Sequence, residues 1–393
     1  MQSLSHLRSQ FLIDPNITFL NFGSFGACPK PIFEDYQKWQ LELEREPVQF
    51  ITVNGLKYLK ESRDSLANYL QCNGDDLVYV TNPSYAVNII AKSFPLKEGD
   101  EVLSTDLEYG ACDKIWEYYC EKQGAKYVKQ HITLPLTTKE KFIDEFFSGL
   151  TNKTKLIFIS HITSSTGLIF PVKEICEIAK QKGLVTFVDG AHAPGHVRLD
   201  LSEFKTDIYT GACHKWMMTP KGCSFLYVKK EYQNLFDPLV ISWGFKSAFP
   251  SQSQFMDYHQ MQGTRDFSAF LTVPKAIQFM NENHWSTVSF QCKQMVLSNA
   301  QRFCELLQSQ PLSPLTTEFI GQLFSIPIQC HEPEKLQRHL FEHYKIEIPV
   351  MRHRDKVYLR YSINACNTQN DLDVLYDALI NITKTTQIIN LSK

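Results

Sequence analysis

The sequence predicts an α/β protein with a large domain around a mainly parallel sheet and a smaller C-terminal α+β domain. Three observations predict this class: short apolar strands alternate with helical patterns through the first two-thirds, one strand–helix–strand unit is complete, and the last third combines short strands with longer helices. A chain of 393 residues is long enough for two or three domains. We place the large domain at residues 15–265 and the smaller one at 266–393, together with the N-terminal segment 1–14.

Four short segments are apolar on both faces, which is typical of strands buried in a parallel sheet. They lie at residues 77–81, 101–104, 156–160 and 185–189. A helix is expected between the last two, because Pro171 stands near its start and Gly183 follows its last turn. Apolar residues recur in it at positions i, i+3, i+4 and i+7 from Val172 onward. This strand–helix–strand unit predicts a doubly wound sheet.

The pattern changes after about residue 268. Helical patterns are followed by short strands at 324–328, 346–350 and 357–362, and we expect a helix between each pair. Thr368 is a suitable N-cap for the final helix, which carries a leucine stripe. The C-terminal third therefore predicts the smaller α+β domain.

Composition excludes several classes of protein. The formal net charge is only −2, so no long-range field would attract nucleic acid or an anionic membrane, and a small-molecule partner is expected. The 11 cysteines include no CxxC pair and the 12 histidines no HExxH, so we expect no metal site and no disulfide framework. The N-terminus lacks a signal-peptide pattern and no apolar run is long enough to span a bilayer, which predicts a cytoplasmic protein.

Polar segments follow the predicted strands at the edge where ligands bind in open α/β sheets. They are residues 81–85 (TNPSY), 160–167 (SHITSSTG), 189–192 (DGAH) and 207–216 (DIYTGACHKW). A single Asp at such a place is usually a cap or turn residue. Together, an Asp, a Lys and a hydroxyl at a helix N-terminus are the parts of a pyridoxal 5′-phosphate (PLP) site: a carboxylate for the ring nitrogen, an amine for a Schiff base, and a place for the phosphate.

The chain also resembles the aminotransferase class V family of fold-type I PLP enzymes, and within it the isopenicillin N epimerase-like branch. The resemblance covers nearly the whole chain. It is carried by the ordered segments 20–26 (LNFGSFG), 189–192 (DGAH), 213–216 (CHKW) with 220–222 (PKG), 239–244 (LVISWG), 262–266 (QGTRD), and 359–362 (LRYS) with 367–368 (NT).

The resemblance implies roles for three catalytic residues. Lys215 would form the Schiff base, Asp189 would pair with the pyridine nitrogen, and His192 would lie near the phenolic oxygen of the ring. A lysine must lose its proton to attack a carbonyl or to move an α-proton, and a neighbouring cation such as a protonated His214 would lower its pKa. Without this context, Lys215 would be read as a surface lysine.

The resemblance also implies a cofactor site shared between the two subunits of a homodimer. Ser84 with the amides around it and His214 would bind the phosphate, with Gly263 and Thr264 reaching across from the second subunit, although a Gly-Thr pair is otherwise an ordinary turn. Tyr109 is the best match for the aromatic ring over the cofactor, whereas Trp116 fits a core residue. The full predicted cofactor-binding set is Ser84, Tyr85, Tyr109, Ser164, Asp189, His192, His214, Lys215, Gly263 and Thr264.

Arg360 matches the residue of the family that binds the substrate α-carboxylate, and its planar fork suits a carboxylate better than a lysine would. An Arg at a strand end is otherwise often a solvated side chain. The segment that contains Asn21, Gly23 and Ser24 could supply backbone amides to the same carboxylate. The substrate side chain is not determined, because the loops expected to contact it, 47–55 and 242–256, have no geometry that the sequence reveals.

The resemblance favours epimerisation or racemisation at the α-carbon of an amino acid or of a molecule bearing one. In that reaction either a second base returns the proton on the opposite face or one base serves both faces, and the sequence does not choose a second base among Tyr85, Tyr209 and Cys213. Aminotransfer and carbon–sulfur lyase activity use the same residues and stay open. A cysteine desulfurase is less favoured, because residues 348–354 hold no cysteine. A non-catalytic relative is disfavoured by the presence of the catalytic lysine, and a dehydrogenase by the absence of G-x-G-x-x-G.

Overall fold

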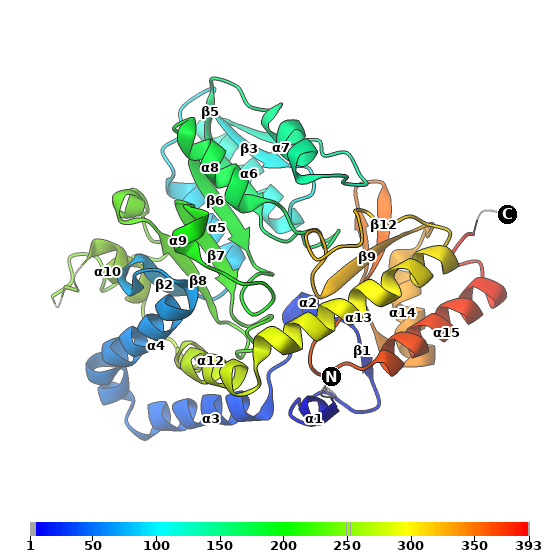
Figure 1. Cartoon of the computed structure of the whole chain (residues 1–393). Helices are drawn as coiled ribbons and strands as arrows, with labels where there is room; N and C mark the ends of the chain where they lie inside the picture. Colours follow the sequence, from blue (N-terminus) through cyan, green and yellow to red (C-terminus); the bar gives the residue numbers. More distant parts are fainter. Residues whose placement is uncertain (1–4, 249, 252, 392–393) are drawn as a thin grey trace.

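The computed structural model describes residues 5–248, 250–251 and 253–391 (Figure 1). Residues 1–4 of the predicted N-terminal segment, and residues 249 and 252 of the predicted loop 242–256, lie outside the described residues. Within the described part of the chain, no helix is both long and apolar enough to cross a membrane.

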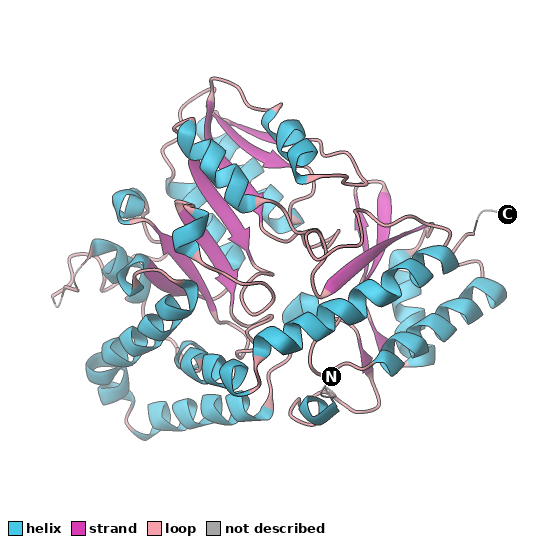
Figure 2. Cartoon of the chain, in the orientation of Figure 1, coloured by secondary structure: helices cyan, strands magenta, loops and turns pink. Residues whose placement is uncertain are grey.

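A seven-stranded sheet forms the centre of the larger part of the molecule and confirms the predicted fold class (Figure 2). Strands β3 to β7 pair in parallel, and β8 is antiparallel to its neighbours β7 and β2. Because β2 is antiparallel to a strand that is itself reversed, its carboxyl end lies at the same edge as those of β3 to β7. In sheet order the strands are β2 (Leu77–Val80), β8 (Ser224–Val228), β7 (Ile208–Ala212), β6 (Val185–Gly190), β5 (Thr154–Ser160), β3 (Glu101–Thr105) and β4 (Lys126–Gln130).

The sheet separates two hydrophobic cores, which explains why its strands are apolar on both faces. Along β5, Ile157 and Ile159 belong to one core, whereas Leu156 and Phe158 belong to the other. Helices α5 (Pro83–Ser93) and α6 (Gly110–Gln123) contribute to the second core, and α4 (Gly55–Leu70) and α8 (Val172–Gln181) to the first. The helix predicted after Pro171 is confirmed as α8.

The C-terminal part contains a three-stranded antiparallel sheet of β9 (Leu323–Ile328), β11 (Val350–His353) and β12 (Lys356–Ser362). The strand predicted at 346–350 is wrong as a single element, because β10 (Ile346–Glu347) pairs instead with β1 (Thr18–Phe19). Pro349 explains the break, since it has no N–H to continue a ladder. The helix predicted between 346–350 and 357–362 is also wrong: a tight turn, with Arg354 at φ 56°, joins β11 to β12.

Long helices complete this part, and α13 runs from beside α12 to the small sheet (Figure 1). Thr368 and Asp371 form a capping box at the start of α15, which confirms the predicted N-cap. The helices with bounds not given above are α1 (Ser5–Arg8), α2 (Phe22–Phe25), α3 (Lys30–Arg45), α7 (Lys139–Phe147), α9 (Leu201–Phe204), α10 (Gln254–Gln260), α11 (Ser268–Leu271), α12 (Val273–Glu282), α13 (Trp285–Leu306), α14 (Pro333–Tyr344) and α15 (Gln369–Thr385).

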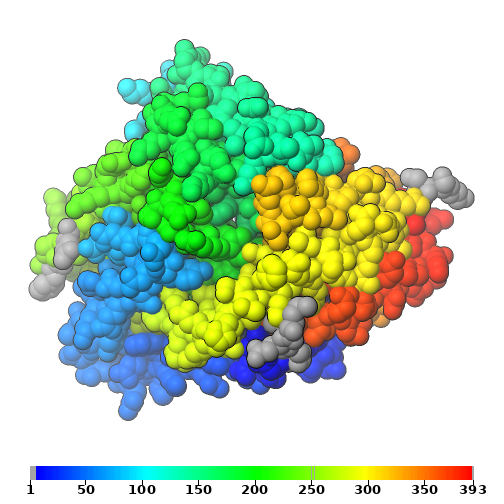
Figure 3. All heavy atoms as spheres, in the orientation of Figure 1, coloured from blue at the N-terminus to red at the C-terminus, as the bar shows by residue number. Residues whose placement is uncertain are grey.

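The beginning of the chain lies against its C-terminal part, where dark blue meets orange and red in the space-filling view (Figure 3). Arg8 forms a 2.8 Å ion pair with Asp371, and the Thr18 amide donates to the Lys345 carbonyl. These contacts connect α1 and β1 to the C-terminal part of the chain. The predicted division at residues 265 and 266 stays a prediction.

Candidate active site

A cavity of about 430 Å³ lies at the carboxyl ends of the strands in the large sheet. Segments that follow β2, β3, β5, β6 and β7 line it, together with the short helix α2. The predicted site residues that line it are Ser24, Ser84, Tyr109, Ser164, Asp189, His192, His214 and Lys215. The parallel sheet thus brings together residues that are up to 131 positions apart in the chain, from Ser84 to Lys215, and α2 adds Ser24.

Lys215 follows β7, and its Nζ lies 3.1 Å from Nε2 of His192. Burial and, to a smaller extent, the nearby charge of Arg360 lower the pKa of Lys215 to about 8, against the opposing effect of Asp189. Burial also lowers the pKa of His192 well below its usual range. A neutral imidazole therefore faces an amine that loses its proton more easily than a solvated lysine does.

Asp189 is the second-last residue of β6 and is only 4% exposed. Its Oδ1 accepts a hydrogen bond of 2.9 Å from the Ala191 amide, and the Cys112 thiol lies 3.6 Å from its Oδ2. Burial raises the pKa of Asp189, and the bond from Ala191 and the charge of Lys215 oppose that rise. Sequence reasoning missed Cys112, although its place one helical turn after Tyr109 puts it on the same side of α6.

Glu108 is a second buried carboxyl group that sequence reasoning missed. It accepts hydrogen bonds from the Ser160 amide at 2.9 Å, from the Thr105 hydroxyl at 2.7 Å, and from the Ser160 hydroxyl. Burial raises the pKa of Glu108 to about 8, and the charge of Asp189 contributes to the rise. Glu108 thus fixes Ser160, which lines the cavity, without lining it itself.

The start of α5 forms one wall of the cavity through Thr81, Asn82, Pro83 and Ser84. The Asn82 side chain accepts a 2.8 Å bond from the Tyr85 amide, so the helix is capped. On the same side, His214 Nδ1 donates to the Cys223 carbonyl at 2.9 Å. Burial lowers the pKa of His214 to about 4, so His214 is neutral near pH 7 and the expectation that its positive charge lowers the pKa of Lys215 is wrong. Tyr85 does not line the cavity, because its hydroxyl donates to Gln262 Oε1 at 3.1 Å.

Arg360 lies behind two residues that line the cavity and is only 1% exposed. Its Nη1 donates to the Ser164 carbonyl at 2.6 Å, and its Nη2 donates to the Ser24 hydroxyl at 3.1 Å. Its Nε has no hydrogen-bond partner, and among the described residues no carboxylate forms an ion pair with it. Burial lowers the pKa of Arg360 to about 10. The prediction that this arginine belongs to the site is consistent with its place; a solvated side chain is excluded.

Several predicted residues do not line the cavity. The Asn21 side chain turns to Glu347, and the Gly23 amide donates to the Ser362 hydroxyl. Gly263 and Thr264 are exposed and lie outside it. Two candidate second bases, Tyr209 and Cys213, are completely buried elsewhere in the core, and no described residue of the loops 47–55 and 242–256 lines the cavity either.

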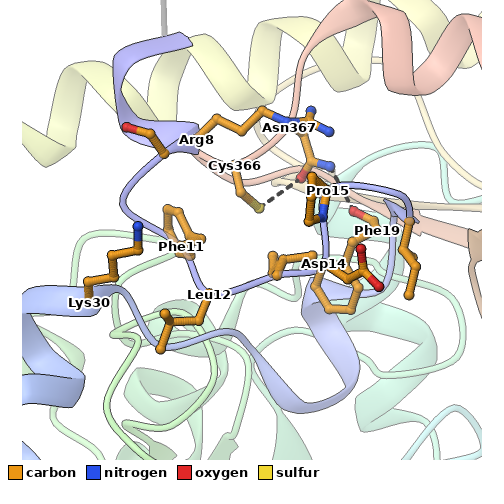
Figure 4. Close-up of a pocket in the computed structure, with 12 residues that line it drawn as sticks. Arg8, Phe11, Leu12, Asp14, Pro15, Phe19, Lys30, Cys366 and Asn367 are labelled. Carbon is orange, nitrogen blue, oxygen red and sulfur yellow. Dashed lines mark hydrogen bonds between the residues drawn. The ribbon is translucent and has the colours of Figure 1, made fainter.

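A larger cavity of about 620 Å³ lies between the N-terminal segment and residues 366–367 (Figure 4). Phe11, Leu12 and Lys30 line it, and none of the predicted site residues does. Its Arg8 already has a carboxylate partner in Asp371. Volume therefore does not locate the chemistry, which depends on the residues around the smaller cavity.

The smaller cavity fits a cofactor with an aldehyde, a basic ring nitrogen and a phosphate. Lys215 offers an amine of lowered pKa, Asp189 offers a buried carboxylate with no ion-pair partner among the described residues, and Ser84 offers a hydroxyl on the first turn of α5. The unpartnered Nε of Arg360 nearby leaves donor capacity for an anionic group.

The comparisons agree with this chemistry. The chain is 31% identical to an isopenicillin N epimerase of Streptomyces clavuligerus, over 96% of this chain and 97% of the relative, and 29% identical to one of Amycolatopsis lactamdurans, over 97% and 98%. It is 28% identical to an L-cysteine desulfhydrase of Arabidopsis thaliana, over 93% and 87%.

Solved structures show the same fold. A cysteine desulfurase from Thermococcus onnurineus matches with a TM-score of 0.83 at 18% identity, over 98% of this chain and 99% of that chain. The cystine C–S lyase C-DES, in a complex with cysteine persulfide, matches with a TM-score of 0.80 at 19% identity, over 93% and 98%. The family model for aminotransferase class V matches residues 34–375, and the cofactor of this family is PLP. The chain therefore belongs to the aminotransferase class V family of PLP-dependent enzymes.

Proposed function

We propose that the enzyme removes the α-proton of an amino acid, or of a molecule that bears one, and returns it to invert the α-carbon. The proposal that the substrate carries an amino-acid carboxylate depends on the environment of Arg360. A buried guanidinium without a carboxylate partner is costly unless a ligand supplies one. Its two Nη groups bond Ser164 and Ser24, which line the cavity, so a substrate carboxylate could take the place of these contacts as a bidentate partner.

Lys215 is proposed as the residue that holds the cofactor and moves the proton. Its lowered pKa gives a useful fraction of free amine near neutral pH. When bound, PLP supplies an electron sink for the negative charge that develops at the α-carbon. Asp189 is proposed to hold the ring nitrogen in its protonated form, and Ser84 with His214 is proposed to bind the phosphate.

Inversion returns the proton on the opposite face of the α-carbon, either through Lys215 itself or through a second proton carrier, and we assign a second carrier, Tyr109. Among the described residues that line the cavity, Tyr109 is the one phenol, and its side chain is 47% exposed. The three candidates that the sequence offered, Tyr85, Tyr209 and Cys213, do not line the cavity, and Tyr109 was expected there only as the aromatic ring over the cofactor. The two epimerase relatives support inversion as the outcome.

Elimination of a thiol from the β-carbon is the second candidate reaction. It needs only one base, Lys215, and relatives named L-cysteine desulfhydrase support it. A desulfurase mechanism has less support, because it needs a nucleophilic thiolate. Cys112 is the cysteine that lines the cavity, and burial raises its pKa well above the usual range.

We further propose that the enzyme is a homodimer with a shared site. Ile241 and Trp243 are 72% and 79% exposed, and Ser242 between them lies beside Gly263. An exposed apolar surface of this kind is typical of an interface. Pairing of two copies here would cover it and carry Gly263 and Thr264 toward the partner's cavity. Sedimentation of the purified chain tests this; a monomer at micromolar concentration would contradict it.

The reaction is tested in deuterated water with isopenicillin N and a panel of L-amino acids that includes L-cysteine. For a substrate of the epimerase, product of inverted configuration should carry α-deuterium. Tyr109→Phe should retain deuterium exchange into recovered substrate but lose inversion. Tyr118→Phe, which lies on α6 outside the cavity, should retain both exchange and inversion. Pyruvate and sulfide from L-cysteine without inversion of any substrate would replace the proposal by the elimination reaction.

A further inference from the structure

The indole of Trp216 constrains the ring of His192. Its Nε1 lies 3.3 Å from Nδ1 of His192, and both side chains are buried. An indole N–H can only donate a hydrogen bond. Nδ1 of His192 must therefore accept, which means that it carries no proton. In a neutral imidazole the proton then sits on Nε2.

The protonated nitrogen faces Lys215. Nε2 of His192 lies 3.1 Å from the Lys215 Nζ, so the imidazole donates and the amine accepts through its lone pair. Only the neutral amine has that lone pair, because an ammonium group is a donor alone. An ammonium at this place would set one N–H against another.

The position of the indole is itself fixed. Trp216 is fully buried, its ring packs on Phe22 with centroids 5.4 Å apart, and on His196 with centroids 4.2 Å apart. His196 Nδ1 lies 2.9 Å from the carbonyl oxygen of His192. This hydrogen bond anchors the backbone of His192, whose ring contacts Trp216. The indole therefore has little freedom to turn its N–H away.

We propose that Trp216 is a positioning residue that holds His192 as the Nε2–H tautomer, so that His192 donates to Lys215 and favours its free amine. The groups with charge that also act on Lys215 are Arg360 on β12, Asp189 on β6 and Cys112 on α6. None of them requires a particular tautomer of His192. The proposed function enters only through the choice of Lys215 as the reactive amine, since the tautomer itself is independent of any reaction.

The test uses the full chain with and without PLP and compares Trp216→Phe with Trp116→Phe. Trp116 is a matched control, because it is also fully buried in the large domain and its Nε1 has no hydrogen-bond partner. Long-range proton–nitrogen spectra of histidine-labelled protein, assigned with His192→Gln, report which ring nitrogen carries the proton. Wild type and Trp116→Phe should show His192 as Nε2–H, and Trp216→Phe should show the Nδ1–H form or a mixture.

A second readout is the pH dependence of imine formation when PLP is added to the cofactor-free chain. Without the indole, His192 can present a lone pair to the ammonium form, so the midpoint should rise by about half to one pH unit, the size of a single hydrogen bond. The midpoint of Trp116→Phe should equal that of wild type.

Three results would overturn the proposal. A wild-type His192 protonated on Nδ1 would do so without any variant, which keeps the test valid even if Trp216→Phe folds poorly. An unchanged tautomer in well-folded Trp216→Phe would do so as well, and so would equal midpoints in the two tryptophan variants. A failure of the proposed reaction would leave the tautomer spectra as they are, so the two failures can be told apart.

Discussion

Replacement of Arg360 by glutamine separates the substrate-binding role of this residue from a role in folding. Glutamine retains donors for the Ser164 carbonyl but loses the positive charge and the fork. Loss of one member of a buried charge pair with the substrate carboxylate costs about 3 kcal/mol, which corresponds to roughly 10²-fold in the Michaelis constant. Cofactor absorption and the turnover at saturating substrate should change much less.

Arg360→Gln should weaken substrate binding but should not weaken the fold. Burial lowers the pKa of Arg360 from 12.5 to about 10. The charged form at neutral pH therefore carries a cost of about 3 kcal/mol in the folded cofactor-free chain relative to the unfolded one. Removing the charge should leave the free energy of unfolding unchanged or raise it, as urea denaturation of the cofactor-free protein would show.

Arg63→Gln is the matched control for this experiment. Arg63 is 4% exposed and donates to neutral oxygens, those of Gln260 at 2.6 Å and Gly74 at 3.3 Å, with a carboxylate oxygen of Asp75 4.0 Å away. None of these contacts lines the cavity, whereas Arg360 contacts Ser164 and Ser24, which do. Arg63→Gln should leave the Michaelis constant unchanged. Two results would refute the proposal that Arg360 binds the substrate carboxylate and has no carboxylate partner before the substrate enters. One is a wild-type Michaelis constant for Arg360→Gln, and the other is a decrease in its free energy of unfolding as large as that of a broken salt bridge.

Three further predictions concern Lys215, Asp189 and the helix cap at Thr368. Because the pKa of Lys215 is lowered to about 8, the rate at which added PLP forms its imine should rise with pH through a midpoint near 8, as stopped-flow absorption would record; a midpoint near 10.5 would contradict the lowered value. Asp189→Asn should keep PLP bound yet lower turnover by roughly 10²-fold or more, since the ring nitrogen loses its counter-charge, and full activity would exclude that role. Thr368→Ala should lower the free energy of unfolding by about 1 kcal/mol through loss of the capping box on α15, measured by urea denaturation, whereas an unchanged value would show the cap to be dispensable.

The sequence allowed us to predict residues whose place follows from the order of strands and helices along the chain. Asp189 and Lys215 were found because the carboxyl ends of parallel strands meet at one edge, whatever the distance between them in the chain. Thr368 was found because a helix needs a cap next to its apolar stripe. Both inferences use only the order of short elements, which the pattern of apolar residues encodes.

Features that depend on contacts between distant segments could not be read from the pattern. Nothing in the residues 77–81 indicates that β2 pairs with the reversed strand β8, and nothing near Asn21 indicates that its side chain turns to Glu347. Trp216 was noted only as part of the segment 213–216, because its contact with His192, 24 positions earlier, is also one between distant segments.

The ionisable groups at the site share one property, which explains how the fold keeps charge available for ligands. Burial disfavours the charged forms of Lys215, Arg360 and Asp189 alike. A direct ion pair between Arg360 and Asp189 would relieve two of these costs, yet among the described residues neither group has an ion-pair partner: Arg360 donates to Ser164 and Ser24, and Asp189 accepts from the amide of Ala191. In the proposed roles of Asp189 and Arg360, an internal pair would also neutralise the charges that are to bind a cofactor nitrogen and a substrate carboxylate. Neutral partners hold each side chain in place without cancelling its charge, so the stability that the fold gives up here becomes binding energy when an oppositely charged ligand enters.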